Sequence, residues 1–228
     1  RRLRHQAAEP RAVLRQHSSY GRQHGSYGRQ HGSYGRQHGS YGRQHGSYGP
    51  YPSHRASRTV SGMTETVDLS ALSAQHSGTP GLVGHLARPE GAGPRPGVVV
   101  VFEAMGADAV NLRLNERMAA AGYLALMPDL YTGRKAIRCM VPTMRQLARG
   151  HGPAFADIEA ARQWLLGEPS CTGKVGVIGF CMGGGFALVL AGQGRFDAAA
   201  ANYGQLPAEL DQAMEGACPV VASYGGGG

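Results

Sequence analysis

The sequence has no long apolar run, although it is 228 residues long. Its longer apolar stretches, at 97–102 and 186–191, fall far short of the roughly 18–20 residues that span a bilayer. No charged-then-apolar signal segment follows Arg1. We therefore expect no transmembrane helix and no membrane partner, and we interpret the start without methionine as a fragment or an uncertain gene start.

Closely spaced cysteines and nucleotide-binding loops are also missing. The four cysteines stand at positions 139, 171, 181 and 218, whereas zinc and redox motifs use pairs about two to four residues apart. No GxGxxG is present, and Thr172-Gly173-Lys174 lacks the rest of a P-loop. We expect neither a metal nor a cofactor. We also expect reduced thiols and a cytoplasmic location, since a chain of this length needs no disulfide framework.

Acidic residues are nearly absent from the first 60 positions, where 11 arginines accompany only Glu9. Residues 61–228 carry 12 basic and 14 acidic side chains, so the net charge of +8 comes from the N-terminal segment alone. Residues 19–46 are four identical copies of Ser-Tyr-Gly-Arg-Gln-His-Gly, a unit without aliphatic residues. Such a unit forms neither a coiled coil nor a packed core, and we expect residues 1–60 to be a disordered tail.

This tail provides a non-enzymatic alternative. Its arginines and tyrosines, on a flexible chain, are the groups with which disordered segments bind single-stranded nucleic acid or self-associate. The other interpretation is a translated tandem repeat with no selected role. Nucleic acid is therefore a candidate partner for the tail only.

From residue 61 onward the pattern is that of an α/β domain with a mostly parallel sheet and flanking helices. Strands are expected at 64–72, 81–87, 97–102, 123–127, 174–180, 198–203 and 219–224, and helices at 108–121, 155–166 and 184–191. Functional sites of such sheets lie at the carboxyl ends of the strands.

The motif Gly179-Phe180-Cys181-Met182-Gly183 stands between an expected strand and an expected helix. This arrangement is a nucleophile elbow, G-x-S-x-G, with cysteine in place of serine. The glycines are needed because a Cβ at either position would strike the neighbouring strand or helix. The helix N-terminus favours the thiolate, and the Met182 amide points to where an oxyanion would form. The alternative is a packing turn that holds an inert cysteine.

Several spaced segments, this motif among them, resemble the dienelactone hydrolase family, a cysteine-nucleophile branch of the α/β-hydrolase fold. The resemblance covers about residue 62 to the end. The matching segments, in order, are 98–103 with Gly106, 120–131, 157–161, 176–185 and the Tyr203-Gly204 turn.

The resemblance implies Cys181 as the nucleophile and Glu103 as the carboxylate that regulates the protonation of the thiol. It further implies an oxyanion hole formed by the amides of Met182 and Ala104. The substrates of the family carry a carboxylate, for which Arg138 and Arg145 are weak candidates. Solvated side chains at the surface are the alternative reading of Glu103 and of both arginines.

An α/β-hydrolase triad places an acid and then a histidine after the nucleophile. The family continues Gly-Gly-x-Asp where this sequence reads 225–228 as glycines, and no histidine follows His151. We interpret His151 as a surface or helix-start residue, and His76 and His85 are equally poor candidates for the base. We expect a truncated copy of the enzyme, or a misassembled coding region, whose Cys181 lacks a base.

The resulting hypothesis is a monomeric, cofactor-free hydrolase of small esters or lactones that works through an acyl-enzyme. Its activity in this chain is expected to be impaired. The alternative is an inactive fragment with a basic repeat tail.

Overall fold

The structure is a computed structural model that describes residues 64–132 and 134–225. These residues belong to a unit spanning Val60–Gly228. The tandem repeat and the rest of the predicted tail, residues 1–60, lie outside the described residues.

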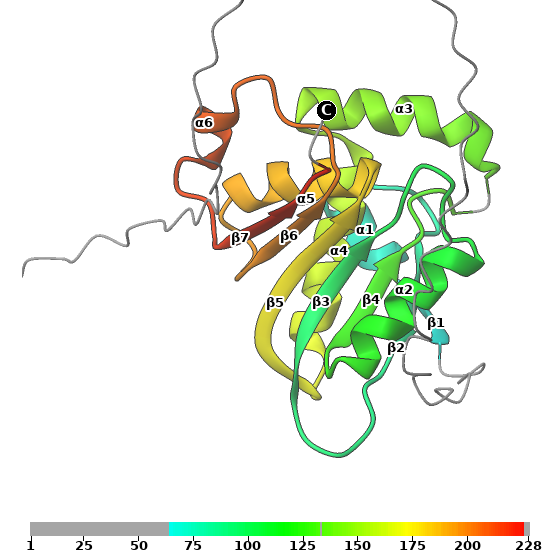
Figure 1. The fold of residues 1–228 in the computed structure, drawn as a ribbon. Helices are drawn as coiled ribbons and strands as arrows, with labels where there is room; N and C mark the ends of the chain where they lie inside the picture. Colours follow the sequence, from blue (N-terminus) through cyan, green and yellow to red (C-terminus); the bar gives the residue numbers. More distant parts are fainter. Residues whose placement is uncertain (1–63, 133, 226–228) are drawn as a thin grey trace, which may run out of the picture. The chain divides into compact units, whose positions relative to one another are not determined.

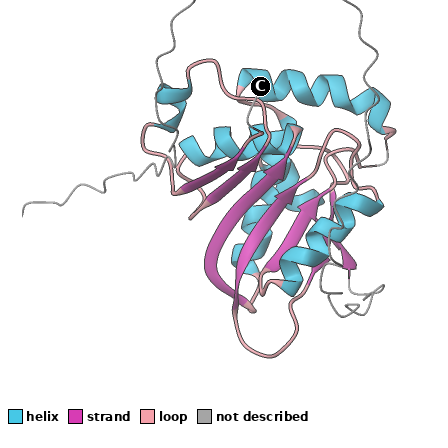
Figure 2. Ribbon diagram, viewed as in Figure 1, coloured by secondary structure: helices cyan, strands magenta, loops and turns pink. Residues whose placement is uncertain are grey.

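The described residues form a sheet in the order β1-β2-β4-β3-β5-β6-β7. The pairs β3 with β4, β3 with β5, β5 with β6 and β6 with β7 are parallel, and only β1 and β2 run antiparallel to their neighbours. The predicted mostly parallel sheet is therefore confirmed (Figure 2). The strand bounds are β1 Thr64–Asp68, β2 Val83–Ala87, β3 Arg95–Val101, β4 Leu124–Pro128, β5 Cys171–Phe180, β6 Ala199–Asn202 and β7 Val220–Ser223.

Helices flank the sheet, with α2 in front of it and α1 and α4 behind it in the view of Figure 1. Helix α5 lies beside α4, because the rings of Phe155 and Phe186 pack with centroids 4.8 Å apart. None of the helices in the described ranges has the length and hydropathy to cross a bilayer. The helix bounds are α1 Ser70–Gln75, α2 Ala109–Ala120, α3 Ala136–Arg149, α4 Pro153–Gly167, α5 Met182–Gly192 and α6 Leu210–Met214.

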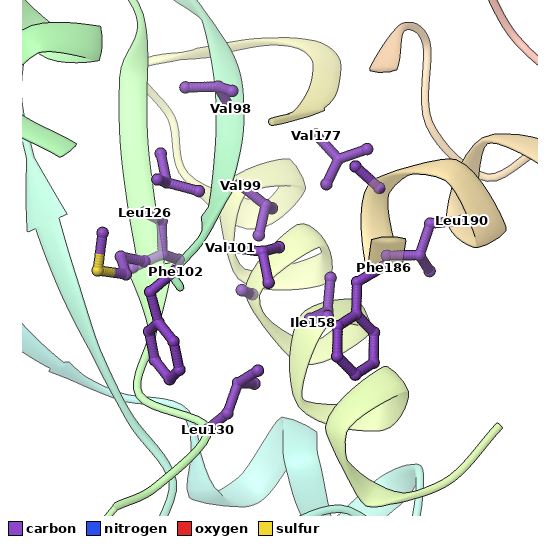
Figure 3. Packing of buried hydrophobic residues seen from close by; sticks show 14 of the residues in the cluster. Val98, Val99, Val101, Phe102, Leu126, Leu130, Ile158, Val177, Phe186 and Leu190 are labelled. Atoms are coloured by element: carbon purple, nitrogen blue, oxygen red, sulfur yellow. The ribbon is translucent and has the colours of Figure 1, made fainter. Parts of the chain in front are cut away.

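The core lies between the central strands and the helices behind them. Val98 to Val101 of β3 are all buried, as expected for a parallel strand covered on both faces. Around Val99 and Val101 lie Ile158 of α4 and Phe186 of α5 (Figure 3). This packing fixes β3, β5 and α5, the elements whose ends carry the predicted site.

The secondary structure expected from the sequence differs from the structure in several places, and the short helix α6 was not expected either. The expected strand 64–72 ends at Asp68, whose carboxylate accepts a hydrogen bond from the Ser70 amide as α1 begins. Helix α3 was not predicted at all, since Pro142 in its interior is normally unfavourable in a helix. The helix forms nevertheless, and it ends at Gly150, whose φ of 72° is left-handed.

Candidate active site

Cys181 occupies the sharp turn between β5 and α5. It is the N-cap of α5, with φ 49° and ψ −116°. A residue other than glycine adopts this conformation only when its surroundings enforce it, and such strain is concentrated at functional sites. Cys181 is exposed, and its amide donates a hydrogen bond of 3.0 Å to the carbonyl oxygen of Asn202. The turn therefore presents a thiol to solvent from a fixed backbone.

The glycines on either side of Cys181 are required by close backbone contacts. A Cβ at Gly179 would overlap the carbonyl group of Gly183. A Cβ at Gly183 would overlap the carbonyl oxygen of Val101 and lie 2.7 Å from that of Phe102. The helix start, the end of β5 and the end of β3 thus meet with no room for side chains, which is the packing that the motif predicts.

Two amides beside the thiol are available to a ligand. Among the hydrogen bonds of the described residues, none is donated by the backbone N–H of Met182 or of Ala104. Met182 opens α5, where the first N–H groups have no partner within the helix. Ala104 lies in the loop after β3, which runs beside β5 with Val101 opposite Gly179. The role of these two amides as an oxyanion hole stays a prediction.

Glu103 is half-buried and pairs with a tyrosine from the end of β6. The Tyr203 hydroxyl donates a hydrogen bond of 2.8 Å to Glu103 Oε1. This bond, then burial, then the charges of Glu103 and Cys181 raise the pKa of Tyr203 to about 12. Tyr203 itself has a left-handed φ of 43°. Glu103 is therefore a carboxylate held by a hydrogen bond at the end of the sheet, and its role in catalysis stays a prediction.

A second tyrosine contacts the loop after β3 through its hydroxyl group. The Tyr131 hydroxyl donates a hydrogen bond of 3.0 Å to the carbonyl oxygen of Ala104 and lies 3.8 Å from Met182 Sδ. Tyr131 is 3% exposed. Burial, followed by the charges of Cys139 and Asp129, raises the pKa of Tyr131 to about 12. The phenol therefore stays protonated, and able to donate, at ordinary pH.

The two arginines predicted to bind a substrate carboxylate lie in different surroundings. Arg138 lines a cavity of about 420 Å³ together with Arg134 and Asp157, and neither Cys181 nor Glu103 lines it. Arg145 is exposed on α3, and no hydrogen bond or ion pair of the described residues joins it to the elbow. The role of Arg145 in substrate binding stays a prediction, and Arg138 belongs to the cavity beside Asp157.

Asp157 lines this cavity and is 1% exposed. Its Oδ1 accepts hydrogen bonds from Ser73 Oγ at 2.8 Å and from the Thr79 amide at 2.7 Å, and its Oδ2 accepts one from Thr79 Oγ1 at 2.6 Å. Burial, which outweighs these bonds, raises the pKa of Asp157. This carboxylate fixes the segment after α1 to α4, a structural role.

No histidine among the described residues is hydrogen-bonded to Cys181, and two of the three lie on elements placed away from it. His85 is on β2, three positions from β5 in the sheet, a separation of roughly 14 Å at about 4.8 Å per strand. His76 follows α1. His151 follows Gly150, and a Cβ at Gly150 would face Val189 of α5. Val189 is eight residues, or about 12 Å along the helix, from Cys181. The described residues also contain no group of three His, Cys, Asp or Glu side chains able to hold a metal.

The sequence analysis named Cys181, Glu103, Ala104 and Met182 but assigned no role to either tyrosine. Tyr131 and Tyr203 stand in segments that carried the resemblance, each shortly after a buried strand. That position was the available signal, because strand ends meet at one edge of the sheet. Their hydrogen bonds join residues 27 and 100 positions apart, which no local pattern reveals.

Known proteins are similar to this chain in sequence. The model of the dienelactone hydrolase family matches residues 82–227. A carboxymethylenebutenolidase from Pseudomonas putida is 29% identical over 174 residues, which are 72% of this chain and 71% of that protein.

Solved structures are similar as well. A dienelactone hydrolase-like promiscuous phosphotriesterase from metagenomic libraries has a TM-score of 0.58 and 28% identity, covering 70% of this chain and 66% of the other. A structure named m3DLH has a TM-score of 0.56 and 32% identity, covering 63% of each chain.

Proposed function

This chain belongs to the dienelactone hydrolase family, and from that premise we propose that Cys181 is the nucleophile with which it hydrolyses small esters or lactones. The strained, exposed position of Cys181 between β5 and α5 is the observation that carries the proposal. An inert cysteine in a packing turn would need neither the strain nor two unpaired amides beside it.

In the proposed reaction, the Cys181 thiolate attacks the carbonyl carbon of the ester or lactone. The carbonyl π electrons move to oxygen, and the amides of Met182 and Ala104 donate hydrogen bonds to the resulting oxyanion. When the oxyanion collapses, the C–O bond to the leaving group breaks, the leaving alkoxide takes a proton from water, and a thioester remains on Cys181. Water then adds to the thioester, which releases the carboxylic acid and regenerates the thiol.

Glu103 and Tyr203 have a proposed role in the protonation of the thiol. A carboxylate at this end of the sheet is a group to which the thiol proton can pass. The hydrogen bond from Tyr203 fixes one oxygen of this carboxylate at 2.8 Å. Glu103 would thereby be placed to take up the thiol proton when a substrate arrives.

The second half of the reaction is proposed to be slow in the 228-residue polypeptide. Hydrolysis of the thioester needs a general base to activate water, and no histidine of the described residues is hydrogen-bonded to Cys181, with His85 and His151 lying away from it. Acylation by an activated ester needs less help, because p-nitrophenolate leaves without protonation. The polypeptide should therefore release a burst of product that is followed by slow turnover.

Stopped-flow kinetics with p-nitrophenyl acetate tests this proposal. The expected result is a burst of about one p-nitrophenolate per chain, which Cys181→Ala abolishes and Cys171→Ala retains. Cys171 is the matched control, since it is another partly accessible thiol on the same sheet. A burst that survives in Cys181→Ala would overturn the proposal.

The alternative of nucleic-acid binding depends on residues 1–60, which lie outside the described residues. Deletion of these residues separates the two functions, because it should leave the burst unchanged. Binding through the tail would be lost on deletion and would weaken steeply with added salt, as phosphate contacts do.

A further inference from the structure

We infer that Tyr131 is a positioning residue for the oxyanion hole, acting through its hydroxyl on the loop that carries the Ala104 amide. The inference rests on the proposed function, because it assigns Tyr131 to the same site. Tyr131 does not touch the reacting atoms. It contacts the two residues whose amides are proposed to hold the oxyanion, Ala104 and Met182.

The loop after β3 needs such a support. Its internal hydrogen bonds run from the Gly106 amide to the Glu103 carbonyl at 3.1 Å and from the Asp108 amide to the Gly106 carbonyl at 2.8 Å. Among the described residues, the Ala104 carbonyl accepts a hydrogen bond only from Tyr131. The peptide group that carries the Ala104 N–H is held on its other side, where the Glu103 carbonyl accepts from Gly106. Without the Tyr131 bond the peptide group that follows Ala104 loses its partner. Tyr131 therefore acts on the Ala104 amide through the backbone angles of Ala104.

The tyrosine is itself held rigidly, so that it can impose a position on the loop. Its ring packs edge-on against Phe102, with centroids 5.1 Å apart. It also lies against Gly106, which has a left-handed φ of 90° and where a Cβ would come within 2.9 Å of the ring. The Tyr131 amide donates to Asp129 Oδ1 at 3.0 Å, which fixes the backbone. The ring is thus part of the core, and the hydroxyl is the part that reaches the site.

Because the ring packs in the core and only the hydroxyl reaches the site, Tyr131→Phe tests the hydroxyl alone. Phenylalanine keeps the ring and its packing, and it removes only the hydrogen bond to Ala104. Because Ala104 is half-buried, water can replace the lost donor, and the midpoint of urea unfolding should shift only slightly. A change in reactivity that accompanies so small a shift then reports on the direction of the amide.

Two reactions of the same thiol separate positioning from a general structural effect. Acylation by p-nitrophenyl acetate passes through an oxyanion, and alkylation by iodoacetamide displaces iodide at a saturated carbon without one. In Tyr131→Phe we expect the acylation rate of Cys181 to fall about tenfold, which corresponds to the loss of one oriented hydrogen bond. The rate and pH dependence of alkylation should stay within twofold of the wild-type values.

The control is Tyr123→Phe, since Tyr123 is 41% exposed and lies outside the site. It should leave both rates unchanged. Equal rates of acylation in Tyr131→Phe and the wild type would overturn the inference, and so would a parallel fall in acylation and alkylation. Failure of the wild-type chain to acylate at Cys181 at all is a separate outcome, which would overturn the proposed function together with the inference.

Discussion

Substitution of Gly183 by alanine tests the packing that positions the nucleophile. The added methyl group would lie 2.7 Å from the Phe102 carbonyl oxygen and closer still to that of Val101, whereas ordinary contacts begin at 3.4 Å. Strand β3 and helix α5 must therefore separate by about 1 Å. Neither is a flexible side chain, so the overpacking should cost about 3 kcal/mol.

Part of that cost is offset, because alanine is favoured over glycine in a helix by about 1 kcal/mol. The expected net loss is about 2 kcal/mol in the free energy of unfolding, or roughly 4–8 °C in Tm for a domain of this size. The effect on reactivity should be larger. A displacement of about 1 Å between a nucleophile and its oxyanion donors lowers the rate about 100-fold.

Urea unfolding and the p-nitrophenyl acetate burst measure both effects. Gly167→Ala is the matched control, because a Cβ at the last residue of α4 meets no atom within 4 Å. It should leave the burst unchanged and stabilise the fold by about 0.5 kcal/mol. The reasoning is refuted if Gly183→Ala is as stable as the control, or if it acylates at the wild-type rate.

Two further pairs of variants probe the polar contacts. Asp157→Ala should lower the free energy of unfolding in urea by about 3 kcal/mol, since three donors from Ser73 and Thr79 lose their acceptor. Asp157→Asn should lower it by about 1 kcal/mol. Because the pKa of Asp157 in the folded protein is raised above 3.8, the free energy of unfolding should fall as pH rises through that pKa. Asp157→Asn should make this fall shallower. A steeper fall in the Asn variant would contradict the raised pKa. Glu103→Gln should lower the pKa of Tyr203 from about 12 toward 10. The measurement is phenolate absorbance as a function of pH, with Tyr203→Phe identifying the contribution of Tyr203. An unchanged pKa would exclude the hydrogen bond between Tyr203 and Glu103.

The elbow was predictable because one short motif marks it. Gly179 must be small because of local contacts with Gly183 and Gly184, and Gly183 must be small because α5 begins against the end of β3. The buried strand of 97–102, bounded by proline and glycine, was equally clear, and β3 covers most of that range. Sequence spacing therefore gave the order of β3, β5 and α5, and with it the edge of the sheet where the site lies.

Non-local contacts decided the rest. Helix α3 contains Pro142 and was missed, because local propensity disfavours a helix that tertiary packing of Cys139, Thr143 and Leu147 stabilises. The partners of Tyr131 and Tyr203 come from distant strand ends, and only the folded chain brings them together. Arg138 was named as a weak candidate for a substrate ligand from its position in the chain, and in the structure it lines a cavity that neither Cys181 nor Glu103 lines.

The central claim is that the fold makes Cys181 a nucleophile. The most direct test is to react the 228-residue chain with p-nitrophenyl acetate in native buffer and in urea, and to map the acetyl groups by mass spectrometry. The claim predicts that in native buffer Cys181 is acetylated far ahead of Cys139, Cys171 and Cys218, and that urea abolishes this preference. Acetylation of all four thiols at similar rates in the native chain would contradict it.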